Sequence, residues 1–175
     1  IFAPSDYNET KTIMRKVADS HVPTYIRLSG VPTPIVYDIE PEFSSIRKHQ
    51  DGNDCTIFTH GTMLHETLQA DFKTNSDVSI VNIPQIKPLP EEEILKEVKN
   101  TGAAVIVEEH SKIGGLAEGI ASLLSEKYPI PIKKVCVDDI FPGTVTVDET
   151  DVYKKFNISR EEIVDSVKEC IRMKN

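Results

Sequence analysis

The feature that most limits the possible folds is a regular alternation of short apolar runs with helix-like segments after residue 54. Four runs are apolar at nearly every position and have the length of strands: Cys55–Thr59, Val78–Asn82, residues 103–107 and Ile132–Val137. Segments whose apolar residues recur at helical spacing separate them. Strands that are apolar on both faces and separated by helices are typical of a mostly parallel sheet covered on both sides. The sequence therefore predicts the α/β fold class.

Helix boundaries in this region carry recognisable signals. Pro90 precedes three glutamates, so a proline stands at the first turn and anions face the positive end of the helix dipole. Gly102 is placed to end that helix. Ser159 and Glu162 form a capping box before the last helix. We therefore expect helices to start near residues 61, 90, 114 and 159.

The first 53 residues follow a different pattern. Residues 1–3 and 25–28 are apolar and strand-like, and between them Asp6 and Glu9 form a D-x-x-E pattern that caps a helix. Prolines and turn residues then interrupt regular structure. The predicted division is residues 1–33, the β-α-β end of one domain; residues 34–53, a linker; and residues 54–175, a second domain.

Charge and composition exclude several classes of protein. Twenty Lys and Arg against 28 Asp and Glu give a net charge of −8, whereas a nucleic-acid surface needs clustered cations. No apolar run reaches the roughly 20 residues of a membrane-spanning helix, and no signal peptide is visible. The three cysteines, Cys55, Cys136 and Cys170, lack the spacing of a zinc site or a C-x-x-C pair. We expect a reduced, cytoplasmic protein that binds neither nucleic acid nor membrane. Because the chain begins inside an apolar run, we also expect a piece of a longer protein.

The segment after the third apolar run contains the strongest candidate site: Glu108, Glu109, His110 and Ser111 at the end of the predicted strand, and Gly114 and Gly115 at the start of the next helix. At such an edge, free N–H groups of a glycine-rich helix start can hold an anion, and Glu with His can transfer protons. The alternative is a tight turn in which Gly114 lets the helix approach closely. The residues alone favour this structural interpretation.

Other polar residues give weaker signals. His60 has no partner at metal-ligand spacing, so we expect a surface or capped histidine. Asp51 and Asn53 lack the later positions of a calcium loop and predict a turn, and Asp138 lies in a predicted solvated loop end. Motifs for phosphate binding, for a nucleophile elbow and for zinc proteases are missing from the sequence. The residues therefore predict neither a complete catalytic set nor a metal site.

Three stretches resemble, in the same order, motifs of transketolase-type C-terminal domains. Residues 56–70 are similar to T-I-I-A-T-G-S-x-V-x-E-A-L-x-A, residues 78–90 to V-x-V-I-N-x-P-x-I-K-P-L-D, and residues 107–116 to V-E-E-H-x-x-x-G-G-L. Residues 1–29 resemble the last β-α-β unit of the pyrimidine-binding domain that precedes this domain. The chain thus resembles the transketolase family over nearly its whole length.

This resemblance implies a three-layer α/β/α domain whose five-stranded sheet is mostly parallel with one antiparallel strand. It implies a parent enzyme that transfers a two-carbon ketol unit between sugars with thiamine diphosphate and magnesium. The chain has no Gly-Asp-Gly motif, so we expect no catalytic, cofactor-binding or metal-binding residue in it and no activity from it alone. Its expected role is structural, in a homodimer, with the rest of the same polypeptide or a separate N-terminal subunit as partner.

Three alternatives accompany this interpretation. 1-Deoxyxylulose-5-phosphate synthases usually carry Asn where His110 stands, and beta subunits of 2-oxo-acid dehydrogenases diverge around the glycine pair. Both differences favour a transketolase. The third alternative is a non-catalytic module that kept the fold. The magnesium-diphosphate motif and the activating Glu of the family, if present upstream, would separate an enzyme from such a module.

Gly30 departs from the pattern of the family. In many transketolases, the strand that resembles residues 25–29 is followed by an Arg that binds the phosphate of the sugar, and Gly30 stands at that position. Arg27 lies three residues earlier and faces the opposite side of a strand, so we expect a structural role for it. We therefore expect the parent enzyme to use an unphosphorylated or differently substituted sugar, or to recruit a cation from outside this chain.

Overall fold

The computed structural model describes residues 1–30, 32–72, 76–140 and 149–174. Its centre is a five-stranded sheet with the strand order β1-β3-β2-β4-β5. The strands are β1 (Arg47–Gln50), β2 (Cys55–Thr59), β3 (Val78–Asn82), β4 (Ala104–Ser111) and β5 (Ile132–Val137). β1 is antiparallel to β3, and the other neighbouring strands pair in parallel. The predicted mostly parallel sheet with one antiparallel strand is confirmed.

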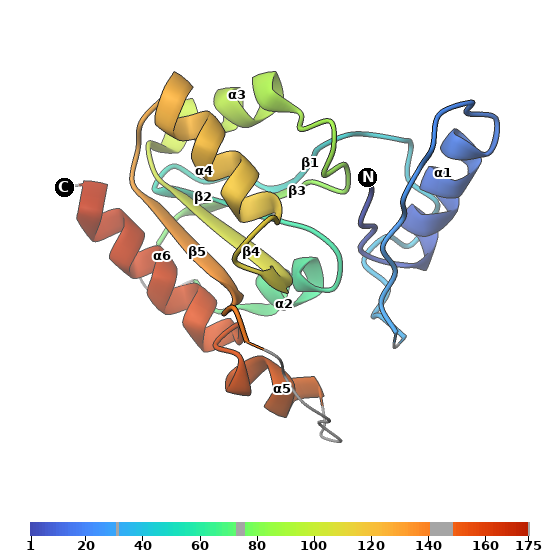
Figure 1. Cartoon of the computed structure of the whole chain (residues 1–175). Helices are drawn as coiled ribbons and strands as arrows, with labels where there is room; N and C mark the ends of the chain where they lie inside the picture. Colours follow the sequence, from blue (N-terminus) through green and yellow to red (C-terminus); the bar gives the residue numbers. More distant parts are fainter. Residues whose placement is uncertain (31, 73–75, 141–148, 175) are drawn as a thin grey trace.

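Helices cover both faces of this sheet (Figure 1). α3 (Glu91–Thr101) and α4 (Leu116–Lys127) pack on one face. α2 (Met63–Gln69) and α6 (Arg160–Lys174) pack on the other. The result is the predicted three-layer α/β/α arrangement. None of the helices in the described ranges is long and apolar enough to cross a membrane.

Successive residues of the central strands enter opposite cores. Ile57 belongs to the cluster beneath α2 and α6, whereas Phe58 belongs to the cluster beneath α3 and α4. Val105 and Ile106 divide in the same way. Because the side chains of a strand alternate between faces, a strand covered on both sides must be apolar at every position. Full burial of each such side chain stabilises the fold by about 1.5–3 kcal/mol.

The predicted signals of α3 are also found. Glu91, Glu92 and Glu93 lie in its first turn. Gly102 ends it in the left-handed conformation with φ of 67° and donates its N–H to Val98 O. Glycine adopts this conformation without the steric cost that a Cβ brings.

The first 30 residues form a helix held between two short contacts rather than the predicted β-α-β unit. α1 (Tyr7–Ala18) begins as predicted, since Asp6 Oδ1 accepts from Glu9 N at 2.8 Å. The two expected strands are reduced to single bridges, in which Phe2 pairs with Ile26 and with Gln85. Two extended runs with few partners are marginal as a sheet, because stable pairing requires several strands beside one another. In Figure 1, α1 lies to one side of the central sheet.

Two elements differ from the sequence-based expectation. β1 lies inside residues 34–53, which were predicted to be a linker. Its residues, Arg-Lys-His-Gln, alternate between half-buried and exposed, as an edge strand does, and so carry no apolar run. α5 (Glu149–Lys155) was not predicted, and β4 extends beyond the predicted residues 103–107 to Ser111. The division of the chain into domains at residues 33 and 53 stays a prediction.

Candidate functional site

The candidate site lies where β4 ends and α4 begins. Glu108 is only 1% exposed, although it carries a carboxylate. Its Oε2 accepts from Leu116 N at 2.9 Å and its Oε1 accepts from Ala117 N at 3.0 Å. A carboxylate at this position satisfies two unpaired N–H groups and faces the positive end of the helix dipole. The anion that the first turn of α4 holds is therefore the side chain of Glu108 itself.

The glycine pair has two separate duties, and the assignment of close approach to Gly114 was wrong. A Cβ on Gly115 would lie 2.7 Å from Cδ of Glu108, a distance that real Cβ atoms almost never show. Gly115 is therefore the residue that lets α4 reach the carboxylate. Gly114 has open space around it, but its φ of 78° lies in the left-handed region.

His60 is not the surface or capped histidine that the sequence predicted. Its side chain is 4% exposed, and its Nε2 lies 3.4 Å from Glu108 Oε2. Thr59 pairs with Val107 across the parallel strands β2 and β4, so the residues that follow each of them meet at the same edge. Nδ1 of His60 is buried, and within the described ranges it has no hydrogen-bond partner.

The surroundings of Glu108 favour its charged form. Burial alone raises the pKa of this carboxyl, but the hydrogen bonds from His60, Ala117 N and Leu116 N outweigh burial and lower the pKa below its usual value. Cys136 donates its thiol to Glu108 Oε1 at 3.7 Å. Burial and then the negative charge of Glu108 raise the pKa of Cys136 to about 12. Cys136 is therefore a neutral thiol and not a nucleophile at neutral pH.

Glu109 joins the site to the first 30 residues. Its Oε2 accepts from Thr62 Oγ1 at 2.8 Å, and its carbonyl oxygen accepts from Arg27 Nη2 at 3.0 Å. The same guanidinium lies 3.7 Å from Glu109 Oε1. Arg27 thus contacts the β4–α4 loop, in keeping with the structural role expected for it.

The remaining candidates lie at the surface. His110 is exposed, and its Nδ1 lies 2.9 Å from Ser111 O. Ser111 Oγ accepts from Ile113 N at 3.2 Å, which is a local turn contact. Gly30 has open space where a Cβ would stand, so a longer side chain would meet no steric barrier there. The structure brings Glu108, Glu109 and the glycine pair together, and Gly30 is not part of this cluster.

A cavity of about 240 Å³ separates the first residues of the chain from this loop. Its polar lining comes from Arg27, His60, Glu108 and His110, and its apolar lining includes Ile86. The cavity lies at the carboxyl edge of parallel strands, where sites of α/β folds gather. Across the described parts of the chain, no three His, Cys, Asp or Glu residues converge as metal ligands. The site has a buried acid and histidine but no nucleophile beside them, so its geometry supports positioning rather than bond making.

The sequence analysis missed the contact between His60 and Glu108 and the role of Arg27 in the loop. A signal for the first contact was present, since both residues directly follow apolar strands. It could be used only once β2 and β4 were known to be neighbours. The partner of Arg27 lies 82 residues away, and no local pattern indicates it.

Comparison with known proteins gives a consistent picture. A family model described as transketolase, C-terminal domain, matches residues 44–163. The 6-deoxy-6-sulfo-D-fructose transketolase subunit SqwH of Clostridium sp. (strain MSTE9) is 32% identical over 100% of this chain and 55% of that protein. A putative transketolase C-terminal section of Methanocaldococcus jannaschii is 33% identical over 97% of this chain and 54% of that protein.

A solved structure described as a split gene transketolase, inactive beta4 tetramer, superposes with a TM-score of 0.91. It is 32% identical, and the match covers 99% of this chain and 58% of that one. This chain therefore spans little more than half the length of the relatives it matches. The family model covers most of the chain, and the likeness of fold extends over nearly all of it. The chain belongs to the transketolase family and contains its C-terminal domain.

Proposed function

We propose that this chain is the C-terminal part of a transketolase-like enzyme that transfers a two-carbon ketol unit between sugars. The observation that carries the proposal is the match to a split gene transketolase over 99% of the chain, which includes the residues before the C-terminal domain. Two relatives are named for transketolase reactions on different sugars, a sulfo-fructose and apulose-4-phosphate. The reaction class is therefore better supported than any one sugar.

The described residues do not fit the cofactor of this reaction. Magnesium bound with a diphosphate requires carboxylate and carbonyl oxygens that converge, and no such group of side chains occurs in the described part of the chain. We propose that thiamine diphosphate and magnesium are bound by residues outside this chain. These residues would belong to the same polypeptide or to a separate subunit in the cytoplasm.

The role we propose for the chain itself is architectural. Glu108 fixes α4 to the end of β4, and Glu109 fixes residues 25–28 to the same loop. A second junction holds α1, since Glu9 Oε1 accepts from Asn82 Nδ2 at 2.8 Å and Glu9 Oε2 accepts from Ser5 N at 2.7 Å. Both junctions bind the first residues of the chain to the edge of the C-terminal sheet. In a homodimer, this would give the preceding domain a fixed position.

The test has two arms. The complete protein, supplied with a ketose donor, an aldose acceptor, thiamine diphosphate and magnesium, should form the new ketose only when the cofactor is present. This chain alone should show neither turnover nor heat of binding when titrated with the cofactor and magnesium. Micromolar binding to the chain alone would contradict the placement of the cofactor site. Lack of turnover by the complete protein with both phosphorylated and unphosphorylated sugars would favour a non-catalytic module instead.

A further inference from the structure

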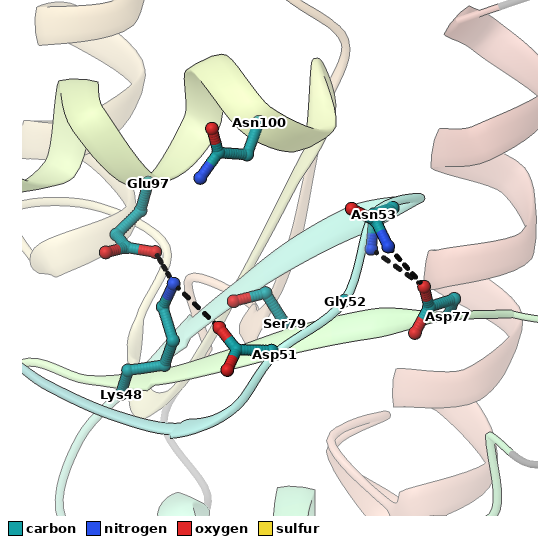
Figure 2. A pocket seen from close by; sticks show the side chains of 8 residues that line it. All are labelled: Lys48, Asp51, Gly52, Asn53, Asp77, Ser79, Glu97 and Asn100. Carbon is teal, nitrogen blue, oxygen red and sulfur yellow. Dashed lines mark hydrogen bonds and ion pairs between the residues drawn. The ribbon is translucent and has the colours of Figure 1, made fainter.

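A polar pocket lies at the opposite edge of the sheet from Glu108. It has a volume of about 430 Å³ and is formed by β1, the turn that follows it, the start of β3 and the end of α3 (Figure 2). Small-molecule sites commonly have volumes of about 300–1,000 Å³. The transketolase reaction proposed above makes no use of this pocket, so its chemistry can be considered independently.

The turn that forms one wall of the pocket is held in place from both sides. A Cβ on Gly52 would lie 2.6 Å from Ser79 N, so the turn packs directly on the backbone of β3. Asn53 donates to Asp77 Oδ2 from its backbone N at 3.1 Å and from its Nδ2 at 2.8 Å. Asp77 N in turn donates to Asp54 Oδ2 at 2.8 Å. The wall is therefore formed before any ligand arrives.

The charged side chains of the pocket give it an excess of negative charge. Lys48 Nζ lies 2.6 Å from Glu97 Oε2 and 3.1 Å from Asp51 Oδ1, as Figure 2 shows. Asp77 adds a third carboxylate, so one cation stands against three anions. Asp51 keeps its second oxygen available, because its side chain is 92% exposed. Such a site repels anions and attracts cations.

Ser79 supplies an independent indication of a missing ligand. Its side chain is 2% exposed, and its Oγ has no hydrogen-bond partner in the described portion of the chain. Figure 2 shows the hydroxyl directed toward the space between Lys48, Asp51 and Glu97. Buried polar atoms of native proteins are rarely unpaired, and each exception calls for an explanation. A bound donor in the pocket would provide one.

The chemistry of the lining narrows the class of ligand. Within the described ranges, no group of side chains meets the requirement for a metal site. An ammonium group has three donors and no acceptor, so it needs a surrounding of acceptors. Ser79 Oγ, Glu97 and the second oxygen of Asp51 provide these, and Lys48 shows that the same carboxylates already accept an ammonium. We propose that this pocket binds a small aliphatic amine through its ammonium group.

Three four-carbon probes that differ only in their ends test the proposal: 1,4-diaminobutane, 1,4-butanediol and succinate. Calorimetric titration of the complete protein at low salt should give saturable binding of the diamine and none of the other two. Hydrogen exchange with the diamine present should slow at residues 77–79. Equal binding of the diol, or no saturable binding of the diamine, would show that the pocket holds only water and overturn the proposal.

Matched variants locate the binding. Ser79→Ala removes only the unpaired hydroxyl and should weaken diamine binding at least fivefold without lowering the melting temperature. Asp51→Asn removes one exposed charge and should weaken it at least threefold. Ser125→Ala is the control, because this hydroxyl lies on α4 and donates to Ser122 O. Unchanged affinity in both pocket variants, or equal loss in the control, would place the amine elsewhere and refute the assignment. Because these readouts need no transketolase activity, they are independent of the proposed function.

Discussion

At the scale of single residues, the contact between Gly115 and Glu108 sets the geometry of the β4–α4 connection. Gly115→Ala would place a methyl group against the carboxylate, and the loss of its two N–H bonds adds to the overpacking. We expect a loss of about 2–3 kcal/mol in the free energy of unfolding, measured with urea. Gly119→Ala, at a helix position with ordinary van der Waals space, is the control and should be neutral or stabilising. Similar stabilities for the two variants would contradict the account of Gly115.

The charge of Glu108 predicts a pH dependence with a definite sign. The pKa of this carboxyl is lower in the folded chain than its usual value of 4.5, so its stabilising effect is present above pH 4.5. The effect is lost as the pH falls through the lower, folded pKa. Wild type should exceed Glu108→Gln by about 1–2 kcal/mol at pH 7, and the gap should narrow toward pH 3. Glu126→Gln, an exposed position on α4, should show no such narrowing. A gap that widened in acid would show that the sign is wrong.

Gly30 bears on the sugar that the proposed enzyme uses. An Arg placed there meets open space, and an Arg–phosphate contact is worth roughly 1.5–3 kcal/mol. Gly30→Arg in the complete protein should therefore raise kcat/KM for a phosphorylated donor relative to an unphosphorylated one by about thirtyfold. Gly30→Gln tests whether length alone has this effect. A wild type that already prefers the phosphorylated donor by several orders of magnitude, and is unchanged by Gly30→Arg, would refute the inference.

At the scale of elements, α1 is attached to the sheet chiefly through buried polar contacts. Glu9 accepts hydrogen bonds from Ser5 N and Asn82, and Tyr37 OH donates to it at 3.3 Å. Glu9→Ala leaves these buried donors unpaired, so hydrogen exchange in α1 should speed up at least tenfold while exchange in β2 and β4 stays unchanged. Glu40→Ala removes an exposed ion pair with Arg15 and should change neither region. Equal acceleration in the sheet would mean that α1 is not a separate unit.

The elements also show what the sequence could predict. β2 and β3 were predicted with their observed bounds, because burial on both faces requires a continuous apolar run. β1 was missed for the converse reason: it lies at the edge, pairs only with β3 and has polar residues throughout. The bond between Glu108 and the start of α4 was not predicted either. The glycine pair indicated a binding place for an anion, but only the packed structure shows that the anion is a side chain of the same chain.

At the scale of the whole molecule, the chain is a sheet domain that holds a short preceding segment, and assembly is where its function should be visible. Glu109 links Thr62 and Arg27 on the loop that presents exposed His110 and Ile113. If this loop supports a homodimer, Glu109→Ala should raise the dissociation constant of the dimer about fivefold, the equivalent of one hydrogen bond of about 1 kcal/mol.

The same variant separates assembly from chemistry. Assayed well above the dissociation constant, Glu109→Ala should keep kcat within about twofold of wild type, because the residue contacts other parts of this chain. Sedimentation velocity over a dilution series measures the first effect, and the assay of ketol transfer measures the second. Glu126→Ala on the exposed side of α4 should change neither quantity. A large fall in kcat with an unaltered dissociation constant would instead place Glu109 beside the reacting atoms, and the β4–α4 loop would then be catalytic rather than architectural.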